Sequence, residues 1–396
     1  MAAPLRALVV ATKSPLPPIG GGNLVLNSLL ECLVSAGVEV RVVAPRGREE
    51  PAHFASYRIE HVPVSPKRWP WLAGHMLAGR SAMIARYHLP ALADAVEKEL
   101  LRFAPDVLHI EQVHLGWLVP RLADRVPVLL RQQNVESDLL RQLAAFFPRS
   151  LAWVLRHEAR VLAAFEAKAC RQAHTVAVIS EPDAELLRRA APEAHVAVLP
   201  PTAPRPPVGP RVHLAGDPPF LCIGSFDWWP NRDGGRWLLR EIWPLLRRLL
   251  PGAKLHLAGP GSDALGREAG ALVHHGVVAL SECLYDQRAT ALIPVRAASG
   301  VRIRLLEAWA AGVPVVSTSV GVRGLGVGDG DGVLVADSPA TFAEAAKRLA
   351  ADGTLRAALA DRGRQHLPAF SARHVAERAI ALYQETCARF GRGLAC

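Results

Sequence analysis

The stretch SGVRIRLLEAWAAGVPVVST, residues 299–318, contains a turn, a helix and a strand in close succession. Gly300 opens the turn, and the residues between it and Gly312 have the mixed apolar and charged pattern of a helix at a domain edge. Gly312 ends that helix, and the apolar, valine-rich run 313–317 is typical of a buried strand. A glycine turn, helix and buried strand in this order are the repeating unit of a parallel α/β sheet.

The same alternation extends through the chain on both sides of this stretch. We expect strands near residues 7–11, 38–43, 107–110, 126–130 and 176–179, and again near 220–223, 254–258, 273–278, 291–295 and 313–317. Helical patterns lie between them; for example, Val154, Val161, Leu162 and Phe165 have the spacing of a core-facing helix stripe. The sequence therefore predicts an α/β fold with parallel sheets covered by helices on both faces.

A proline-rich segment divides the alternation into two blocks. Residues 199–210, LPPTAPRPPVGP, can form neither a helix nor a central strand and read as a stiff linker. We expect Rossmann-like domains at 1–199 and 211–375, a linker at 200–210, and residues 376–396 returning to the first domain. The returning segment belongs to a final helix, expected near residues 372–390.

Composition excludes several classes of protein. The chain has 396 residues, of which 50% are hydrophobic and 21% charged, which excludes a disordered or fibrous protein. The first apolar run, residues 7–11, is too short for a signal peptide and fits a strand. Six scattered cysteines without a C-x-x-C pair favour reduced thiols in a cytoplasmic protein over a zinc site or disulfides.

The net charge of +10 is spread along the chain. It suits an anionic substrate or an anionic membrane surface. No basic block or aromatic-interleaved motif is present, so we do not expect a nucleic acid partner.

The glycine triplet Gly20-Gly21-Gly22 lies between the first expected strand and a helix. Glycines there allow a phosphate or sugar to approach the backbone next to a helix N-terminus, although a flexible turn has the same composition. The triplet is not a G-x-G-x-x-G motif, and the second strand ends in Pro45-Arg46-Gly47-Arg48 rather than a ribose-binding acid. A nicotinamide dehydrogenase is therefore not expected.

The 299–318 stretch also has residues suited to a nucleotide. A diphosphate could rest on the helix N-terminus with help from Arg302 or Arg304, and Glu307 could accept hydrogen bonds from two ribose hydroxyls. The alternative is an ordinary ion pair between Arg304 and Glu307 on an exposed helix.

Residues 300–325, GVRIRLLEAWAAGVPVVSTSVGVRGL, resemble the nucleotide-sugar signature of GT-B glycosyltransferases of family 4, also called glycosyl transferase group 1. The resemblance covers the whole chain. It includes the glycine triplet and the segments DVLH (106–109), QNVES (133–137), IGSFDWWPN (223–231) and LAGPG (257–261). The segments NVES and FDWWPN are similar to a bacterial exopolysaccharide-associated branch. This implies a GT-B fold, with two Rossmann-like domains facing each other across a cleft.

The resemblance also implies roles for individual residues. Glu307 corresponds to the residue that binds the donor ribose. The donor diphosphate is expected at Gly22, Gly300, Arg302 and Arg304, beside donor-site loops that contain Gly224, Asn231, Arg232 and Gly259. His109 ends a strand and reads as a packed or capping residue, whereas Glu111 and His114 are expected to orient the acceptor or donor sugar as catalytic residues.

Five positions depart from the family pattern. Ser299 stands where an earlier glutamate is common, and Ser225 and Asn231 stand where an arginine and a lysine commonly bind the diphosphate. Glu111 replaces a histidine that often contacts the donor sugar, and Gln133 replaces a histidine before NVES. We therefore expect Arg302, Arg304 and Arg232 to meet the phosphate charge.

The implied activity is retaining, metal-independent transfer from a nucleoside-diphosphate sugar to a carbohydrate, lipid-linked or small-molecule acceptor in bacterial glycan biosynthesis. The nucleotide sugar is a co-substrate, and no cofactor or metal is expected; Asp329-Gly330-Asp331-Gly332 fits a hairpin-like turn better than a metal site. The nucleotide base is expected near residues 276–280. The alternatives are a sugar-nucleotide epimerase or hydrolase of the same fold and a degenerate, non-catalytic binding protein.

The stretch 63–80 suits peripheral contact with the inner membrane. It combines Trp69, Trp71 and Met76 with Lys67 and Arg68, which is a composition found at bilayer interfaces. The same residues would equally line an acceptor groove or pack as a loop.

Overall fold

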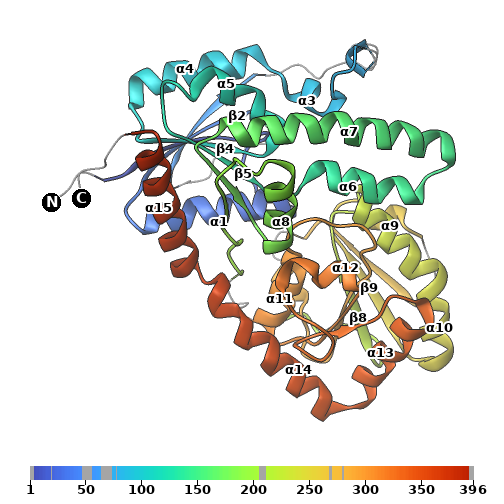
Figure 1. Ribbon diagram of the computed structural model, residues 1–396. Coiled ribbons are helices and arrows are strands. Elements are labelled where there is room, and N and C mark those ends of the chain that lie inside the picture. Colours follow the sequence, from blue (N-terminus) through green and yellow to red (C-terminus); the bar gives the residue numbers. More distant parts are fainter. Residues whose placement is uncertain are drawn as a thin grey trace. The chain divides into compact units, whose positions relative to one another are not determined.

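The computed structural model describes residues 4–18, 20–46, 56–63, 74–76, 78–204, 211–266, 270–278 and 281–391. It contains two compact units: the first comprises residues 1–201 and 372–396, and the second residues 202–371. Each unit is a parallel sheet flanked by helices, so the predicted α/β class is confirmed (Figure 1). Most of the residues that prompted the membrane prediction, 64–73 and 77, lie outside the described residues, as do 205–210 of the proline-rich segment.

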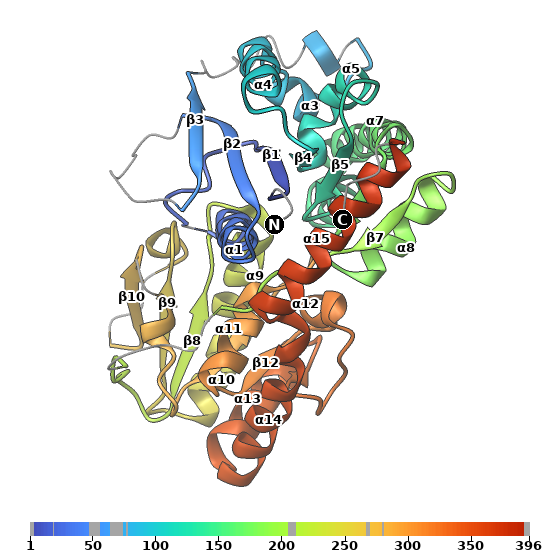
Figure 2. The same ribbon diagram turned by 90° about the vertical axis from the view of Figure 1, so that its left-hand side faces the viewer.

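The first unit contains a seven-stranded sheet of order β3-β2-β1-β4-β5-β6-β7, and Figure 2 shows β3, β2 and β1 side by side. Its strands are β1 (Arg6–Val10), β2 (Glu39–Pro45), β3 (Arg58–Val62), β4 (Val107–Glu111), β5 (Val128–Gln132), β6 (Thr175–Val178) and β7 (Val196–Val198). Its helices are α1 (Gly21–Ser35), α3 (Ala82–Tyr87), α4 (Pro90–Phe103), η1 (Val113–Leu118), α5 (Val119–Leu122), α6 (Glu136–Leu143), η2 (Ala144–Phe146), α7 (Arg149–Gln172), α8 (Glu181–Ala190) and α15 (Ala372–Arg389).

Both faces of this sheet are buried. Leu8 and Val10 of β1 belong to the core on one face, whereas Ala7 and Val9 belong to the core on the other. The strand is continuously apolar for this reason. The C-terminal helix α15 covers the second face together with α1, burying side chains that include Leu382 (Figure 1).

The second unit contains a six-stranded parallel sheet of order β10-β9-β8-β11-β12-β13. Its strands are β8 (Pro219–Ile223), β9 (Lys254–Ala258), β10 (Leu272–Gly276), β11 (Thr290–Ile293), β12 (Val315–Ser317) and β13 (Leu334–Val335). Its helices are α9 (Trp229–Trp237), the π-helix η3 (Leu238–Ile242), α10 (Trp243–Leu249), η4 (Ser262–Ala264), η5 (Ser281–Leu284), α11 (Ile303–Ala311), α12 (Ser319–Val322), η6 (Arg323–Leu325), α13 (Pro339–Ala351), α14 (Gly353–His366) and η7 (Leu367–Phe370).

The turn expected at 329–332 is confirmed. Gly330 and Gly332 both have positive φ, and the Gly330 N–H donates to the carbonyl of Val333 at 2.8 Å. The carboxylate of Asp331 is 2.8 Å from Nε2 of His366, which ties the turn to the end of α14.

Two details of the sequence prediction are corrected. Strands β3, β7 and β13 are absent from the sequence prediction, and all three are edge strands. The helix stripe predicted from Val154 to Phe165 is confirmed in part: Leu162 is fully buried and Phe165 packs against the core, whereas Val154 and Val161 are half-buried. The sequence prediction missed Glu158 and Glu166, which also lie on the buried face of α7. Among the described residues, no helix has the length and apolarity needed to cross a bilayer.

Candidate functional site

The strand order of the second unit reverses between β8 and β11, and open parallel sheets bind ligands beyond the strand ends at such a point. Two predicted donor-site glycines lie there, Gly224 after β8 and Gly259 after β9. Gly259 has a φ of +114°, and a Cβ on it would lie 2.1 Å from the Gly224 carbonyl oxygen. Only glycine fits at 259, so the two loops meet backbone to backbone.

The turn before α11 follows β11 at the same switch point. Gly300 has a φ of +72°, and its carbonyl oxygen would lie 2.2 Å from a Cβ placed on Gly324. Arg302 occupies the N-cap position with extended backbone, and the first turn of α11 has no acidic residue. The helix N-terminus therefore keeps its partial positive charge, which favours a bound anion.

Glu307 lies in α11 with its carboxylate fixed by two donors. Arg304 Nη1 is 2.7 Å from Oε1 and 2.6 Å from Oε2, and the Tyr285 hydroxyl donates to Oε2 at 2.9 Å. Burial and the charge of Glu307 raise the pKa of Tyr285 well above its usual range, so this hydroxyl stays a donor. A carboxylate has about four acceptor positions, so these contacts leave capacity for further donors.

The ion pair between Arg304 and Glu307 is therefore present. It differs from the ordinary pair on an exposed helix that the sequence also allowed, because it is largely buried. Its side chains are 23% and 5% exposed. In this structure the Arg304 guanidinium is directed at the carboxylate. A contact between Arg304 and a diphosphate stays a prediction, and it requires this side chain to turn.

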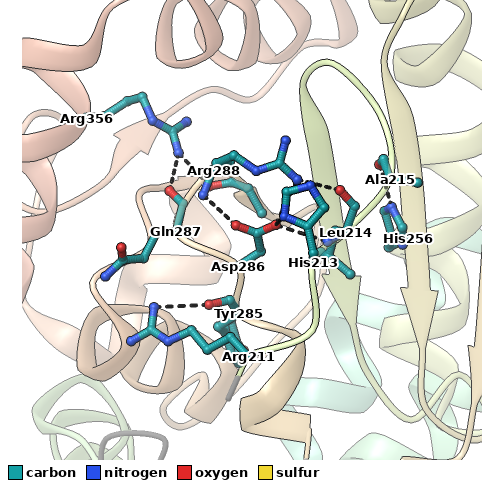
Figure 3. Close-up of polar contacts among 11 residues, drawn as sticks. Arg211, His213, Leu214, Ala215, His256, Tyr285, Asp286, Gln287, Arg288 and Arg356 are labelled. Carbon is teal, nitrogen blue, oxygen red and sulfur yellow. Dashed lines mark hydrogen bonds and ion pairs between the residues drawn. The ribbon is translucent and has the colours of Figure 1, made fainter. Parts of the chain in front are cut away.

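Tyr285 was not identified from the sequence, because the irregular segment around it has no motif or period. Figure 3 shows how its loop is held. Arg211 Nη1 donates to the carbonyl of Tyr285 at 3.2 Å and to that of Ala311, at the end of α11, at 2.9 Å. The next residue, Asp286, accepts from the backbone N–H of Leu214 at 3.0 Å. The loop is thus fastened to residues 211–214, and its position sets that of the Tyr285 hydroxyl.

Other predicted donor-site side chains lie around the loop after β8. Asn231 Nδ2 donates to the carbonyl of Ser225 at 3.1 Å. Arg232 Nε donates to the carbonyl of Phe226 at 2.8 Å. Arg302 lies over the Trp228 ring, with Cζ 5.6 Å from the ring centroid. The structure therefore brings Arg302 and this loop together, while Asn231 and Arg232 hold the backbone of the loop.

In the first unit the strand order reverses between β1 and β4. The predicted glycine turn lies there, with Gly20 at a φ of +85° before α1. Gln133 Nε2 donates to the carbonyl of Gly22 at 3.2 Å, and a Cβ on Gly22 would lie 3.1 Å from Gln133 Oε1. The turn is thus held close to the end of β5.

Glu111 at the end of β4 is almost completely buried and bonded through both oxygens. Oε1 accepts from Arg131 Nη1 at 3.0 Å and from Gln133 Nε2 at 2.8 Å. Oε2 accepts from His109 Nε2 at 2.9 Å, which leaves Nδ1 to accept from the Tyr383 hydroxyl at 2.7 Å. Burial disfavours the charged form of Glu111, but Arg131 and His109 outweigh it and lower the pKa of this carboxyl.

His114, the other residue predicted to be catalytic, lies in η1 and is also buried. Burial lowers the pKa of His114, and its ring is 4.9 Å from that of Tyr87. Glu111 and His114 are thus interior residues of the first unit. His109 is packed, as one interpretation of the sequence had it, whereas Arg131 and Tyr383 were not identified from the sequence.

Each of the two units matches a known family model over most of its length. Residues 217–352 match the family model described as "Glycosyl transferases group 1", and residues 20–202 match the "Glycosyl transferase 4-like domain". A curated relative, an uncharacterized 44.6 kDa protein in the cps region of Klebsiella pneumoniae, is 25% identical over 135 residues. That match covers 31% of this chain and about a third, 35%, of the relative.

Solved structures of low identity share the fold over nearly the whole chain. Sucrose-phosphate synthase from Thermosynechococcus elongatus has a TM-score of 0.76 at 18% identity, covering 97% of this chain and 99% of that one. WaaG, a glycosyltransferase of lipopolysaccharide biosynthesis, has a TM-score of 0.63 at 15% identity, covering 95% and 99%. HepE of Anabaena, in complex with UDP-glucose, has a TM-score of 0.64 at 14% identity, covering 96% and 99%.

Proposed function

Because the chain belongs to the group 1 glycosyltransferases and has their GT-B fold, we propose that it is a retaining, metal-independent transferase of a nucleotide sugar. The acceptor would be a carbohydrate, a lipid-linked sugar or a small molecule, reached in the cytoplasm during bacterial glycan synthesis. The cps-region relative and WaaG support a role in cell-surface polysaccharide synthesis. HepE, crystallised with UDP-glucose, supports a nucleoside-diphosphate sugar as donor.

The buried Glu307 carboxylate carries this proposal. It lies on α11, at the switch point of the second sheet, and Arg304 and Tyr285 fix its orientation. The remaining acceptor positions suit the two neighbouring hydroxyls of a ribose. Because the carboxylate is already oriented, little conformational freedom is lost when the nucleotide binds.

The diphosphate would lie at the N-terminus of α11. The Gly300 turn allows close approach, the helix dipole favours the negative charge, and Arg302 supplies a full positive charge from the N-cap position. These groups would stabilise the charge that develops on the leaving diphosphate, which is the main requirement of the transition state.

The transfer step follows the front-face route implied by the family. The acceptor oxygen bonds to the anomeric carbon as the bond from that carbon to the phosphate oxygen breaks, both on one face of the sugar. The acceptor proton passes to the departing phosphate, so no protein base is needed. Glu111 and His114 would then act as positioning residues, since both are buried in the first unit.

Nucleotide titration tests the proposal. We expect calorimetry against UDP, GDP, ADP, CDP and TDP to give one clear ligand whose affinity does not depend on magnesium. Glu307→Ala should weaken that affinity by about a hundredfold, the loss of about two charge-assisted hydrogen bonds. Glu344→Ala is a matched control, because Glu344 also pairs three residues along a helix of the same unit, with Lys347, but on the surface.

Equal affinities in the wild type and Glu307→Ala would reject the site. Product analysis with the matching nucleotide sugar and no acceptor tests the reaction class, because a transferase leaves the donor largely intact. Rapid isomerisation or release of free sugar would indicate an epimerase or hydrolase instead. Failure of every nucleotide to bind would favour a non-catalytic binding protein.

A further inference from the structure

We propose that the exposed face of α7 docks on the surface of an anionic lipid bilayer. This inference is independent of the transfer reaction proposed above. It depends on how charged and aromatic side chains are distributed between the two faces of one long helix, which lies beside α6 in Figure 1.

The charges of α7 are separated by face. The helix contains four arginines, one lysine and two glutamates. Both glutamates, Glu158 and Glu166, are buried. All the basic residues are exposed: Arg149, Arg156, Arg160, Lys168 and Arg171. The charged residues on the solvent-facing side of α7 are therefore all basic.

The two glutamates are used inside the unit. Glu158 Oε1 accepts from the Ser81 hydroxyl at 2.6 Å and from the backbone N–H of Met83 at 3.1 Å, which fastens the start of α3 to α7. Glu166 accepts from the backbone N–H groups of Glu136 and Ser137 at the start of α6. Neither carboxylate is available to neutralise the exposed face.

An exposed tryptophan lies in the middle of the basic stripe. Arg149, Trp153, Arg156 and Arg160 are spaced at i, i+4, i+7 and i+11, so they share one side of the helix. The Trp153 side chain is 67% exposed, and Leu151 at the same end of α7 is 42% exposed. Burial in this unit does not explain these apolar side chains, whereas the boundary between lipid headgroups and acyl chains accommodates both.

The segment fastened to α7 extends the basic surface. Arg80 and Arg86 flank the contact between Ser81 and Glu158 and are exposed, and the sequence from 74 to 90 has no acidic residue. Arginines with exposed tryptophan and leucine favour a bilayer over a nucleic acid, because a phosphate backbone would satisfy the arginines but give Leu151 and Trp153 no apolar environment.

Vesicle binding of the full chain tests the proposal. We expect the protein to co-sediment with vesicles of phosphatidylcholine and phosphatidylglycerol but not with phosphatidylcholine alone, and binding to weaken with added salt. Replacing Arg149, Arg156 and Arg160 with glutamine should lower the affinity about a hundredfold, at about fivefold for each arginine.

The matched control removes the same charge elsewhere in the first unit. Arg121, Arg189 and Arg373 are exposed and each pairs with a carboxylate, so their triple glutamine variant should bind vesicles within about twofold of the wild type. Quenching of tryptophan fluorescence by brominated lipid should fall in Trp153→Phe, which shows that this side chain enters the interface.

Three outcomes would overturn the proposal. The control triple variant could lose as much vesicle affinity as the α7 triple variant, which would show that binding depends on the net charge of the protein and not on α7. A double variant, Trp69→Ala with Trp71→Ala, could lose vesicle binding while the α7 triple variant and Trp153→Phe keep it. That result would place the membrane contact in the stretch 63–80. Binding of single-stranded RNA without binding of anionic vesicles would assign the face to a nucleic acid. None of these results depends on nucleotide binding, so they are distinguishable from failure of the proposed transferase.

Discussion

The orientation of Glu307 depends on a hydroxyl from outside its own helix. Arg304 lies one turn away on α11, and any rotation of that helix would move both residues together. Tyr285 comes from a separate loop, which Arg211 connects to the end of α11. The Tyr285 hydroxyl therefore fixes the carboxylate relative to the rest of the unit.

Tyr285→Phe should consequently weaken nucleotide binding. A hydrogen bond to a charged group contributes about 1.5–3 kcal/mol, and we expect about a tenfold loss of affinity because Arg304 still holds the carboxylate. Calorimetric titration of the best nucleotide measures this directly.

Tyr57→Phe in the first unit is the control. The Tyr57 hydroxyl also donates inside the protein, to Asn27 Oδ1 at 2.5 Å. Its removal should lower the free energy of unfolding by about 1 kcal/mol and leave nucleotide affinity unchanged. If both variants bind nucleotide as the wild type does, Tyr285 is structural and does not position Glu307.

The sequence singled out Glu307 as a candidate but did not reveal the charged residues buried inside the first unit. Arg131 in the middle of a buried sheet and Glu166 on a buried helix face each look like solvated residues in the sequence. What makes them tolerable in the interior is a partner far along the chain, such as Glu111 for Arg131. Local periodicity contains no signal for such pairs.

At the scale of elements, α6 packs along α7, and the buried Glu166 carboxylate of α7 binds the start of α6. Glu166 accepts from the backbone N–H groups of Glu136 and Ser137 at 2.9 and 3.3 Å. These residues begin α6, where backbone N–H groups lack partners within the helix. Burial raises the pKa of Glu166 to about 7, with a smaller contribution from Glu136. Desolvation therefore outweighs the hydrogen bond from the Ser137 side chain and the two backbone donors.

This shift predicts a loss of stability as pH rises. The pKa of Glu166 is higher in the folded state than in the unfolded state, so the folded protein binds more protons between about pH 4.5 and about pH 7. The stabilisation is complete below that range, falls as pH rises through it and is lost above about pH 7. The whole change is of the order of 3 kcal/mol.

Denaturant unfolding between about pH 5 and about pH 8 measures the effect against Glu166→Gln. The glutamine oxygen can still accept from the start of α6, but it does not ionise. The wild type should lose stability relative to this variant as pH rises. Parallel curves for the two proteins would show that Glu166 does not titrate in this range.

Most of the strands that the sequence predicted are buried on both faces, although the predicted strand β10 is a half-buried edge strand. These strands, such as β1 and β8, are continuously apolar, because helices cover both sides of each sheet. Strand β3, RIEHV, is an edge strand with charged residues, and β7 and β13 have three and two residues. Such segments pair because a neighbouring strand is already in place, a condition that no local pattern reports.

At the scale of the molecule, the chain leaves the first unit at Pro201 and returns to it at Ala372. The proline-rich segment marked the first crossing in the sequence, since six prolines interrupt every regular pattern. The return of the chain to the first unit has a weaker sequence signal. It depends on apolar residues of α15 that complete the core of that unit, among them Val375, Leu382 and Tyr383. Because each unit has its own core, we expect each to unfold as its own cooperative transition.

Leu382→Ala and Leu349→Ala form a matched pair that tests this division. Both leucines are fully buried, the first in α15 of the first unit and the second in α13 of the second. Each substitution should cost about 2–5 kcal/mol, which lowers the melting temperature of the affected unit by about 5–15 °C. In calorimetry, Leu382→Ala should move one transition and Leu349→Ala the other.

The bound nucleotide identifies the transitions, because a ligand stabilises the unit that binds it. If Glu307 is the nucleotide site, the transition raised by nucleotide must be the one lowered by Leu349→Ala. Nucleotide that raised the transition sensitive to Leu382→Ala would place the site in the first unit. A single transition moved equally by both substitutions would mean that the two cores unfold together.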